Sequence, residues 1–306
     1  MISSSSSRRR HRQVGRQLLI DVACSLTDRD REILRLLRWH RVLTTSQLRV
    51  MFFSDLNTAQ HRMTRLHGLR LVERFRPLRN GREAEYHYVL DRLGAFVVAA
   101  MESDHPDKEV NIRWRTDQAF SIATSQRLAH TIGANDLFVH LAAAARTTPG
   151  AELETWWGEA YCKKVLGEVV CPDGLGVWSE GGATFTFCLE YDRGSEPLWR
   201  LARKASDYAR LESAWGVAFW LLVVVPSPRR EAGVRAALSG EGLAAATTTQ
   251  VSARTPAEAV WAPLGADDAR LRLAELAVWP RPAASAARLA TAAPHGTGDE
   301  RDEETG

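Results

Sequence analysis

The stretch from Ala183 to Asp192 constrains the fold most, because its residues alternate strictly between two faces of an extended chain. Aromatic and large aliphatic side chains fall on one face, and mainly polar side chains fall on the other. This period of two predicts a β-strand with one buried face. Gly181-Gly182 precedes it and supplies the positive φ angles of a tight turn, so a hairpin partner is expected just upstream.

Three acidic residues are expected at one end of this hairpin. Glu190 and Asp192 lie on the same face of the strand, and the hairpin brings Asp173 near them. Converging carboxylates repel one another unless a cation lies between them, and ligation by oxygen alone suits Mg²⁺. Asp173 and Glu190 are the predicted metal ligands. The alternative is a turn at Asp173 and a solvated strand end.

A helix is predicted after this strand, entered at Gly194-Ser195, with Glu196 and Pro197 in its first turn. Its buried stripe at helical spacing comprises Leu198, Leu201, Ala205 and Tyr208. Lys204 lies at the edge of that stripe and could reach back over the strand ends. A metal held by carboxylates, together with a lysine that offsets negative charge, is the minimum set for metal-assisted phosphodiester cleavage. The alternative for Lys204 is an exposed helix cation.

Composition indicates a globular protein with room for two domains. The 306 residues are 45% hydrophobic and 25% charged, which are ordinary values. The longest apolar run, Gly216–Val225, is too short to span a bilayer and favours a central buried strand. The four cysteines show no zinc-ligand spacing and do not suggest a disulfide framework. We expect a cytoplasmic protein with reduced thiols and no membrane partner.

Charge is distributed unevenly along the chain. Residues 1–100 carry 19 Lys and Arg against 9 Asp and Glu, a net of +10; the whole chain carries +3, which leaves −7 for the remainder. This asymmetry indicates a polyanionic partner held mainly by the front half. Residues 1–20 are predicted to be a disordered basic arm and residues 281–306 a disordered acidic tail, because both contain little apolar surface.

The first domain, residues 21–101, has the pattern of three helices followed by a basic hairpin. Thr27 with Asp30 approximates a capping box, and Thr44 caps a second helix. A third helix is expected after Asn57, before a hairpin turn that Asn80-Gly81 would form. The order resembles a winged helix-turn-helix, in which the third helix enters the major groove and cations of the wing lie along phosphates.

Double-stranded DNA is the partner that this resemblance implies. The expected DNA-binding residues are Gln60, His61, Arg62, Thr64 and Arg65 of the third helix and Arg76, Arg79 and Arg82 of the hairpin. Gln60, His61 and Arg65 suit base edges, whereas Arg62 and the hairpin arginines would hold the DNA backbone. The alternative is a winged helix used for protein pairing. A helix capped by Asp91 could close the domain or support a homodimer.

Residues 102–120 are predicted to be a linker, and residues 121–280 a second domain. A long helical segment, Ser121–Arg146, opens this domain and contains His130, Asn135 and Asp136. A lone histidine there is more typical of a helix face than of a ligand. Further predicted elements are strands near residues 153–157, 247–251 and 259–263 and a helix over Ser227–Leu238.

Several motifs, taken in order, resemble those of the replication-relaxation family, plasmid and mobile-element proteins tied by name to plasmid replication and DNA relaxation. The motifs are the winged helix, His130 with Asn135-Asp136, Pro172-Asp173-Gly174, Leu189–Glu196, Lys204 with Tyr208, and the strand ending at Val223–Ser227. This resemblance covers most of residues 25–265. The rear half also looks like the restriction-endonuclease fold, whose signature is Pro-Asp, then an acidic residue, any residue and lysine. Here Asp192 occupies the lysine position, and Lys204 could substitute.

The resemblances imply an α/β (α+β) fold, with a winged helix-turn-helix followed by a restriction-endonuclease-like mixed-sheet domain. They imply a DNA-binding protein of plasmid replication or relaxation, with other replication or transfer proteins as partners. In an active nuclease, Asp173 and Glu190 would hold Mg²⁺, Lys204 would stabilise the scissile phosphate, and Asp136 or Asp192 would assist. The alternatives are a non-catalytic DNA-binding scaffold and a transcription regulator whose rear domain senses a ligand.

Overall fold

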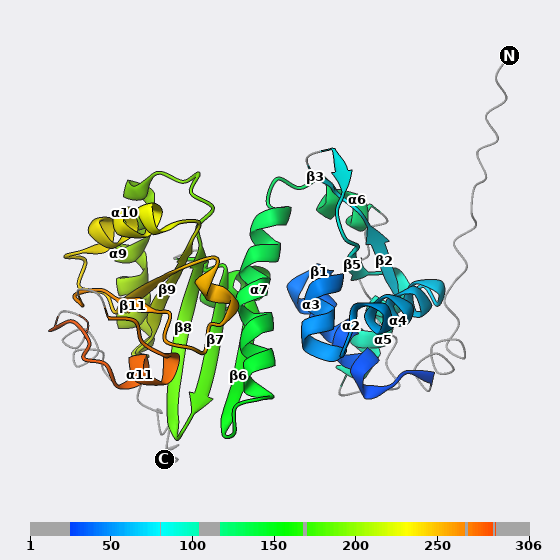
Figure 1. Ribbon diagram of the computed structural model, residues 1–306, viewed down its shortest axis with the longest axis horizontal. Coiled ribbons are helices and arrows are strands. Elements are labelled where there is room, and N and C mark those ends of the chain that lie inside the picture. The colour runs from blue at the N-terminus through cyan, green and yellow to red at the C-terminus, as the bar shows by residue number, and fades with distance from the viewer. Residues whose placement is uncertain are drawn as a thin grey trace, which may run out of the picture. The chain divides into compact units, whose positions relative to one another are not determined.

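The computed structural model describes residues 25–79, 81–103, 117–167, 170–266, 269–283 and 285 (Figure 1). The expected basic arm lies outside these residues, as do most of the expected linker and acidic tail. The chain divides into two compact units, residues 1–125 and 126–306. Within the described ranges, no helix is long and apolar enough to cross a membrane.

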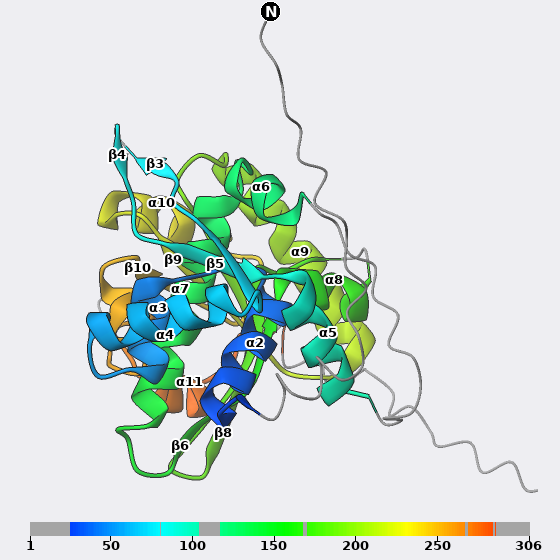
Figure 2. The same ribbon diagram turned by 90° about the vertical axis from the view of Figure 1, so that its right-hand side faces the viewer.

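The first unit combines helices with small antiparallel sheets. Its helices are α2 (Asp28–His40), α3 (Thr45–Phe52), α4 (Leu56–Gly68), α5 (Arg92–Met101) and α6 (Gln118–Ala123). A three-stranded sheet has the order β1-β5-β2, formed by β1 (Leu43–Thr44), β5 (His87–Leu90) and β2 (Val72–Phe75). Between β2 and β5 in the chain, β3 (Leu78–Arg79) and β4 (Arg82–Glu83) pair as a two-stranded ribbon (Figure 2).

Side-chain caps fix where these helices begin. Thr27 and Asp30 form a reciprocal capping box, and Thr44 forms another at the start of α3, as the sequence predicted. The expected start of α4 is corrected by two residues: Asp55 is its cap and accepts a hydrogen bond from the Thr58 amide at 2.8 Å. Asp91 caps α5, which confirms that prediction.

The end of α2 buries a histidine in the core of the first unit. Only 4% of His40 is exposed. Burial lowers the pKa of its imidazole to about 3, because the charged form loses its hydration inside the protein. His40 is therefore neutral in the folded protein at ordinary pH.

Acidification is expected to destabilise the protein through His40. The folded pKa lies below the unfolded value of 6.5, so the stability that the neutral form contributes is complete above about pH 6.5 and declines as pH falls towards 3. Between pH 7 and pH 5 the loss is about 2 kcal/mol. Denaturant unfolding of the wild type and His40→Gln at both pH values measures it. The variant should lose less stability than the wild type on acidification, and equal losses would contradict this assignment.

A six-stranded mixed sheet forms the centre of the second unit, in the order β11-β10-β9-β8-β7-β6. The strands are β6 (Ala151–Gly158), β7 (Gly174–Glu180), β8 (Ala183–Tyr191), β9 (Trp220–Val225), β10 (Ala245–Thr249) and β11 (Ala262–Pro263). β6, β7 and β8 pair antiparallel, whereas β8, β9 and β10 run parallel. The predicted hairpin is confirmed: Gly181 and Gly182 join β7 to β8 with φ of 60° and 83°.

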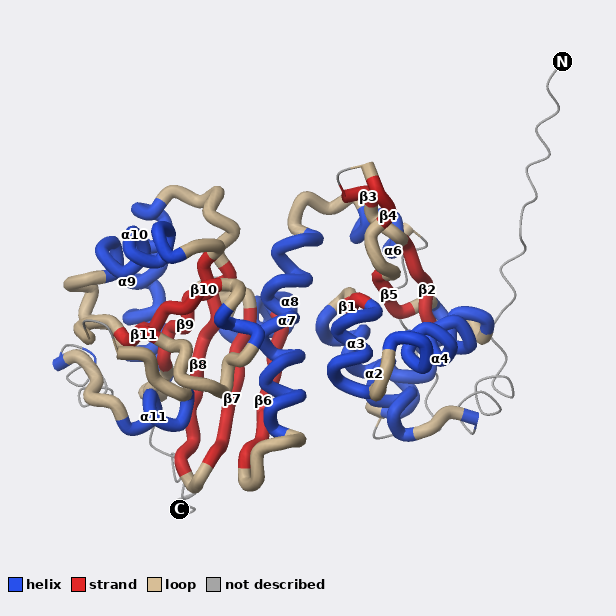
Figure 3. The backbone as a smooth tube through the Cα atoms, in the orientation of Figure 1, coloured by secondary structure: helices blue, strands red, loops and turns tan. Residues whose placement is uncertain are grey.

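Helices cover both faces of this sheet (Figure 3). α7 (Leu128–Ala145) and α11 (Leu273–Val278) pack on one face, around a core that includes Phe138, Phe187 and Trp261. α8 (Glu159–Leu166), α9 (Leu198–Trp215) and α10 (Pro228–Leu238) pack on the other. α10, β9 and β10 match predicted elements within a few residues, whereas α8 has no counterpart among the predicted elements.

Three expectations for the second unit need correction. The segment Ser121–Arg146 is not one helix but α6 and α7, because the chain passes from the first unit to the second between them. β8 has two buried faces in its second half, because α9 covers the side that carries Cys188 and Glu190. α9 begins at Leu198, with Pro197 as its cap instead of within its first turn.

Candidate functional site

One edge of the six-stranded sheet gathers acidic side chains. β8 ends at this edge, and β7 begins there because the two strands are antiparallel. Asp173 immediately precedes β7, and its backbone amide donates to the Leu189 carbonyl at 2.9 Å. The hairpin thus places Asp173 beside Glu190, as its predicted geometry required.

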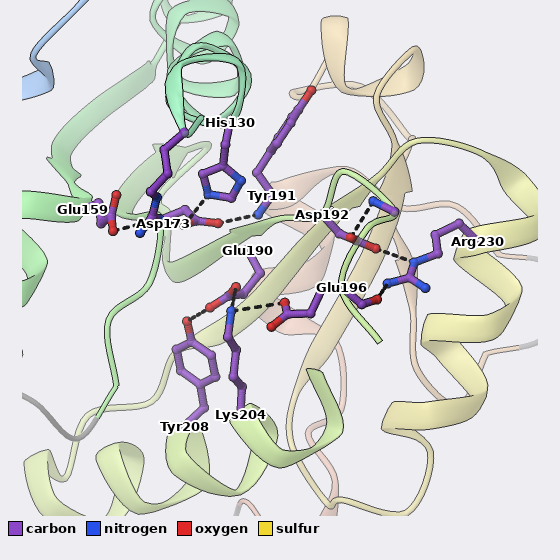
Figure 4. A network of polar contacts seen from close by, with 12 residues as sticks. His130, Glu159, Asp173, Glu190, Tyr191, Asp192, Glu196, Lys204, Tyr208 and Arg230 are labelled. Atoms are coloured by element: carbon purple, nitrogen blue, oxygen red, sulfur yellow. Dashed lines mark hydrogen bonds and ion pairs between the residues drawn. The ribbon is translucent and has the colours of Figure 1, made fainter. Parts of the chain in front are cut away.

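Glu190 lies beneath α9 with 5% of its side chain exposed. The Lys204 ammonium donates to Glu190 Oε2 at 2.7 Å, and the Tyr208 hydroxyl donates to Oε1 at 2.5 Å (Figure 4). Burial and the negative charge of Asp173 raise the pKa of the Glu190 carboxyl to about 7, although Lys204 and Tyr208 stabilise its charged form. Both oxygens of Glu190 are held by α9.

Lys204 is placed between two carboxylates. Its ammonium also lies 3.6 Å from Glu196 Oε2, in the loop before α9. Burial alone would lower the pKa of Lys204, but the charge and hydrogen bond of Glu190 outweigh burial and raise it. Lys204 is therefore a fixed positive charge, and 35% of its side chain remains exposed at the surface.

A histidine from α7 completes the surroundings of Asp173. His130 Nε2 lies 2.7 Å from Asp173 Oδ1, and the Tyr191 amide donates to Oδ2 at 2.8 Å (Figure 4). Burial would lower the pKa of His130, but the bond to Asp173 raises it overall. The Arg127 guanidinium lies 3.8 Å from Asp173 Oδ1 and 2.9 Å from Glu159.

Asp192 and Asp136 do not join this pair. Asp192 follows the last residue of β8, and its Oδ2 accepts from Arg230 Nε of α10 at 2.5 Å while Oδ1 accepts from the Gly194 amide at 2.7 Å. Asp136 lies on α7, where its Oδ2 is 3.8 Å from His140. The expected convergence of three carboxylates is thus corrected to two, because Arg230 draws the Asp192 carboxylate towards α10.

The remaining pair, Asp173 and Glu190, provides part of the ligand set that a hard divalent cation needs. Over the described ranges, no group of three or more His, Cys, Asp and Glu residues could hold a metal ion by itself. Mg²⁺, however, is usually held by one or two carboxylates, with waters and substrate phosphates completing its octahedron. Asp173 and Glu190 provide two carboxylates near enough for one charge to raise the pKa of the other.

Helix ends add positive potential to this edge. α8, α9 and α10 each follow a strand that ends there, so their amino-terminal ends point towards it. The amino terminus of a helix carries a partial positive charge of roughly half an elementary charge. The edge therefore tolerates an anion better than its acidic residues alone would allow.

The first unit presents the expected DNA-binding residues in two groups. Gln60, His61, Thr64 and Arg65 are exposed on α4, on the side opposite its buried stripe of Ala59, Met63 and Leu66. Arg82 is exposed on β4, and the Arg79 side chain lies outside the described residues. Arg76 pairs with Glu83 at 2.6 Å and with the Ala84 carbonyl at 2.9 Å, so the ribbon itself holds it.

A cavity of about 480 Å³ lies between α3, α4 and the strands that flank the ribbon. Its lining includes Gln60 and Thr64 of α4 and the basic residues Arg74 and Arg76. Both guanidinium groups lie over the Tyr86 ring, at 4.4 and 4.9 Å from its centroid. Glu85 also lines this recess, so it presents two arginines and one carboxylate beside the exposed face of α4.

Arg62 has a different contact from the one expected. It lies on the flank of α4, and only 17% of its side chain is exposed. Its Nε donates to one carboxylate oxygen of Asp30 in α2 at 2.6 Å, and its Nη2 contacts the other. Asp30 is fully buried. Arg62 therefore forms an ion pair that joins α4 to α2, and its expected role at the DNA backbone stays a prediction.

The family model described as Replication-relaxation matches residues 34–218, which is more than half of the 306-residue chain. The chain belongs to the replication-relaxation family. The match spans α4 and the ribbon as well as the site formed by Asp173, Glu190 and Lys204 in this replication-relaxation protein. No curated protein and no solved structure matches the chain.

Sequence reasoning gave no functional role to His130, Tyr208 or Glu196 of this replication-relaxation protein. His130 and Tyr208 contact Asp173 and Glu190 directly, yet each looked like an ordinary position on a helix. A signal was nevertheless available, because all three fall within the motifs that carry the family resemblance. The pairings themselves join residues far apart in the chain.

Proposed function

We propose that the protein binds double-stranded DNA through its first unit and nicks one strand with Mg²⁺ at Asp173, Glu190 and Lys204. This proposal treats the first unit as a winged helix-turn-helix and the second as a restriction-endonuclease-like domain. A role in plasmid replication or relaxation accords with the family. The observation that carries the proposal is the 2.7 Å contact of Lys204 with Glu190, beside Asp173.

The arrangement has the groups that metal-assisted phosphodiester cleavage needs. Asp173 and Glu190 would hold the divalent cation, which when bound would polarise the phosphate and lower the pKa of a water molecule. His130 and Tyr208 orient the two carboxylates through the hydrogen bonds they make. Lys204 stays charged and partly exposed, so it is suited to bind a phosphate oxygen as negative charge develops.

Lys204 could also take the place of the lysine that the restriction-endonuclease signature requires. That signature places lysine two residues after the acidic residue on one strand, where this chain has Asp192. Lys204 instead comes from α9 and reaches Glu190 from the face that the helix covers. The lysine charge thus lies beside the carboxylate of Glu190, although α9 and not β8 supplies it, which supports a functional site.

DNA binding by the first unit is supported by its element order and surface. Three helices, α2 to α4, precede an antiparallel ribbon, and α4 exposes Gln60, His61, Thr64 and Arg65. Side chains of these types can read base edges in a major groove. The cavity beside α4, which Arg74 and Arg76 line together with Glu85, could receive the sugar-phosphate backbone.

Substitutions on α4 and on the ribbon should have different effects on DNA binding. Arg65→Ala is expected to reduce discrimination among DNA sequences, because Arg65 is exposed on the proposed reading face. Arg82→Ala should weaken binding to all sequences alike and lower the slope of log affinity against log salt by about one, because it removes one phosphate contact. Band-shift titrations at several salt concentrations measure both. Unchanged binding in both variants would exclude this surface as the DNA site.

A non-catalytic DNA-binding scaffold is the second candidate, and the same site gives it some support. Lys204 and Tyr208 already satisfy Glu190, so these three groups form a neutral network that could serve stability alone. Incubation of the purified protein with supercoiled plasmid, with and without Mg²⁺ or Mn²⁺, separates the two candidates. Metal-dependent formation of nicked circles supports the nuclease. Plasmid that is bound but stays supercoiled supports the scaffold.

A further inference from the structure

An exposed tryptophan stands on the helix that supplies Lys204. Trp199 lies in the first turn of α9 with 60% of its surface exposed. The Arg200 guanidinium covers one side of its ring, 5.3 Å from the centroid. Leu201, Ala205 and Tyr208 face the sheet, so packing of the second unit does not require the indole.

The basic residues of α9 form a path from the candidate site to this indole. A helix turns about 100° per residue, so Arg200, Arg203 and Trp199 lie roughly 40°, 100° and 140° around the axis from Lys204. Arg200 and Arg203 are exposed, and neither forms an ion pair within the described part of the chain. Farther along the helix, Arg210 is paired with Asp207 at 2.6 Å.

We propose that Lys204, Arg200, Arg203 and Trp199 form a track for single-stranded DNA leaving the candidate nuclease site. The arginines would hold successive phosphates, and the open side of the Trp199 ring would stack on one base. Such stacking favours single strands, because bases in a duplex are already stacked on one another. That the strand leaves a nuclease site rests on the proposed nuclease function. The track adds that the site accepts DNA in single-stranded form.

Fluorescence anisotropy with a labelled 20-nucleotide oligothymidylate and a duplex of equal length tests the track in the full-length protein, without metal. Trp199→Leu should weaken binding of the single strand roughly 5- to 150-fold, which is the usual effect of losing one stacked base. Trp199→Phe should retain most of the affinity because it keeps a π-face. Binding of the duplex should change less than twofold in both variants.

Matched controls come from the same helix. Trp215 is 40% exposed at the far end of α9, about 24 Å along the axis, so Trp215→Leu should leave single-strand binding unchanged. Arg203→Ala should lower the salt slope for the single strand by about 0.7, whereas Arg210→Ala should not.

The track would be overturned if Trp199→Leu kept its affinity for the single strand, or if it lost as much affinity for the duplex as for the single strand. An equal loss of single-strand affinity in Trp215→Leu would also overturn it. A change in the oligomeric state of Trp199→Leu with unchanged DNA affinity would overturn it as well, because it would show that the indole packs against a second copy. Because the assay scores no cleavage, single-strand binding can be confirmed even if the plasmid is never nicked. Nicking without a Trp199 effect would reject only the track.

Discussion

Loss of either carboxylate of the pair is expected to abolish both the response to metal and the nicking of plasmid. Mg²⁺ or Mn²⁺ should raise the melting temperature of the wild type, because the cation offsets repulsion between Asp173 and Glu190. Asp173→Asn and Glu190→Gln keep the shapes of the side chains but remove a charge. Both should eliminate the temperature increase and lower nicking by more than about a hundredfold, since even outer-shell residues of metal sites commonly contribute 10- to 100-fold.

Lys204→Met should separate the two effects. The lysine is proposed to contact phosphate instead of metal, so this variant should keep the metal-induced rise in melting temperature and lose nicking. Lys164→Met on the exposed side of α8 is the matched control and should behave as wild type. A flat metal response in the wild type would leave the second unit as a scaffold. A metal response without nicking under any condition would indicate a structural cation site.

Arg62→Ala is expected to destabilise the protein by about 3–5 kcal/mol, which is the usual effect of leaving a buried charge without its partner. The charge left behind is the carboxylate of Asp30, which is fully buried at the start of α2. Urea unfolding measures the loss. Arg65→Ala, on the exposed face of the same helix, should change the free energy of unfolding by no more than about 0.5 kcal/mol.

A double substitution tests whether the two residues act as a pair. Asp30→Ala with Arg62→Ala should cost less than the sum of the single changes, because the second substitution removes the group that the first left unpaired. Asp30→Ala also removes the capping box of α2, so it alone costs about 1 kcal/mol more than the lost pair. A stable Arg62→Ala protein with weakened DNA binding would return Arg62 to the DNA surface.

Local patterns predicted most of the elements, and long-range packing accounts for the differences. The alternation from Ala183 and the turn at Gly181-Gly182 depend only on neighbouring residues, so the β7–β8 hairpin followed directly. That the polar face of β8 is also covered depends on α9, which returns across the sheet. No pattern within the strand could reveal a helix packed against it.

In the candidate site, too, local patterns predicted some contacts, and others depend on long-range packing. The proximity of Asp173 and Glu190 follows from the hairpin, and the reach of Lys204 follows from helical spacing. The withdrawal of Asp192 depends on Arg230, 38 residues later in the chain, and the burial of Arg62 depends on Asp30, 32 residues earlier. Each is an ion pair between separate elements, and many arginines in the sequence could have filled either role.

The β7–β8 turn offers a place to attach a reporter. From Asp173 to Gly181 the hairpin spans about 25 Å at the usual rise per residue, so its tip lies at the opposite end of β7 from the candidate site. Thr184 is exposed there. Burial raises the pKa of the Cys162, Cys171 and Cys188 thiols, which makes them poor nucleophiles near neutral pH. With Cys24 changed to serine, Thr184→Cys would therefore accept a fluorophore selectively, and DNA engagement could be followed in real time without disturbing the chemistry.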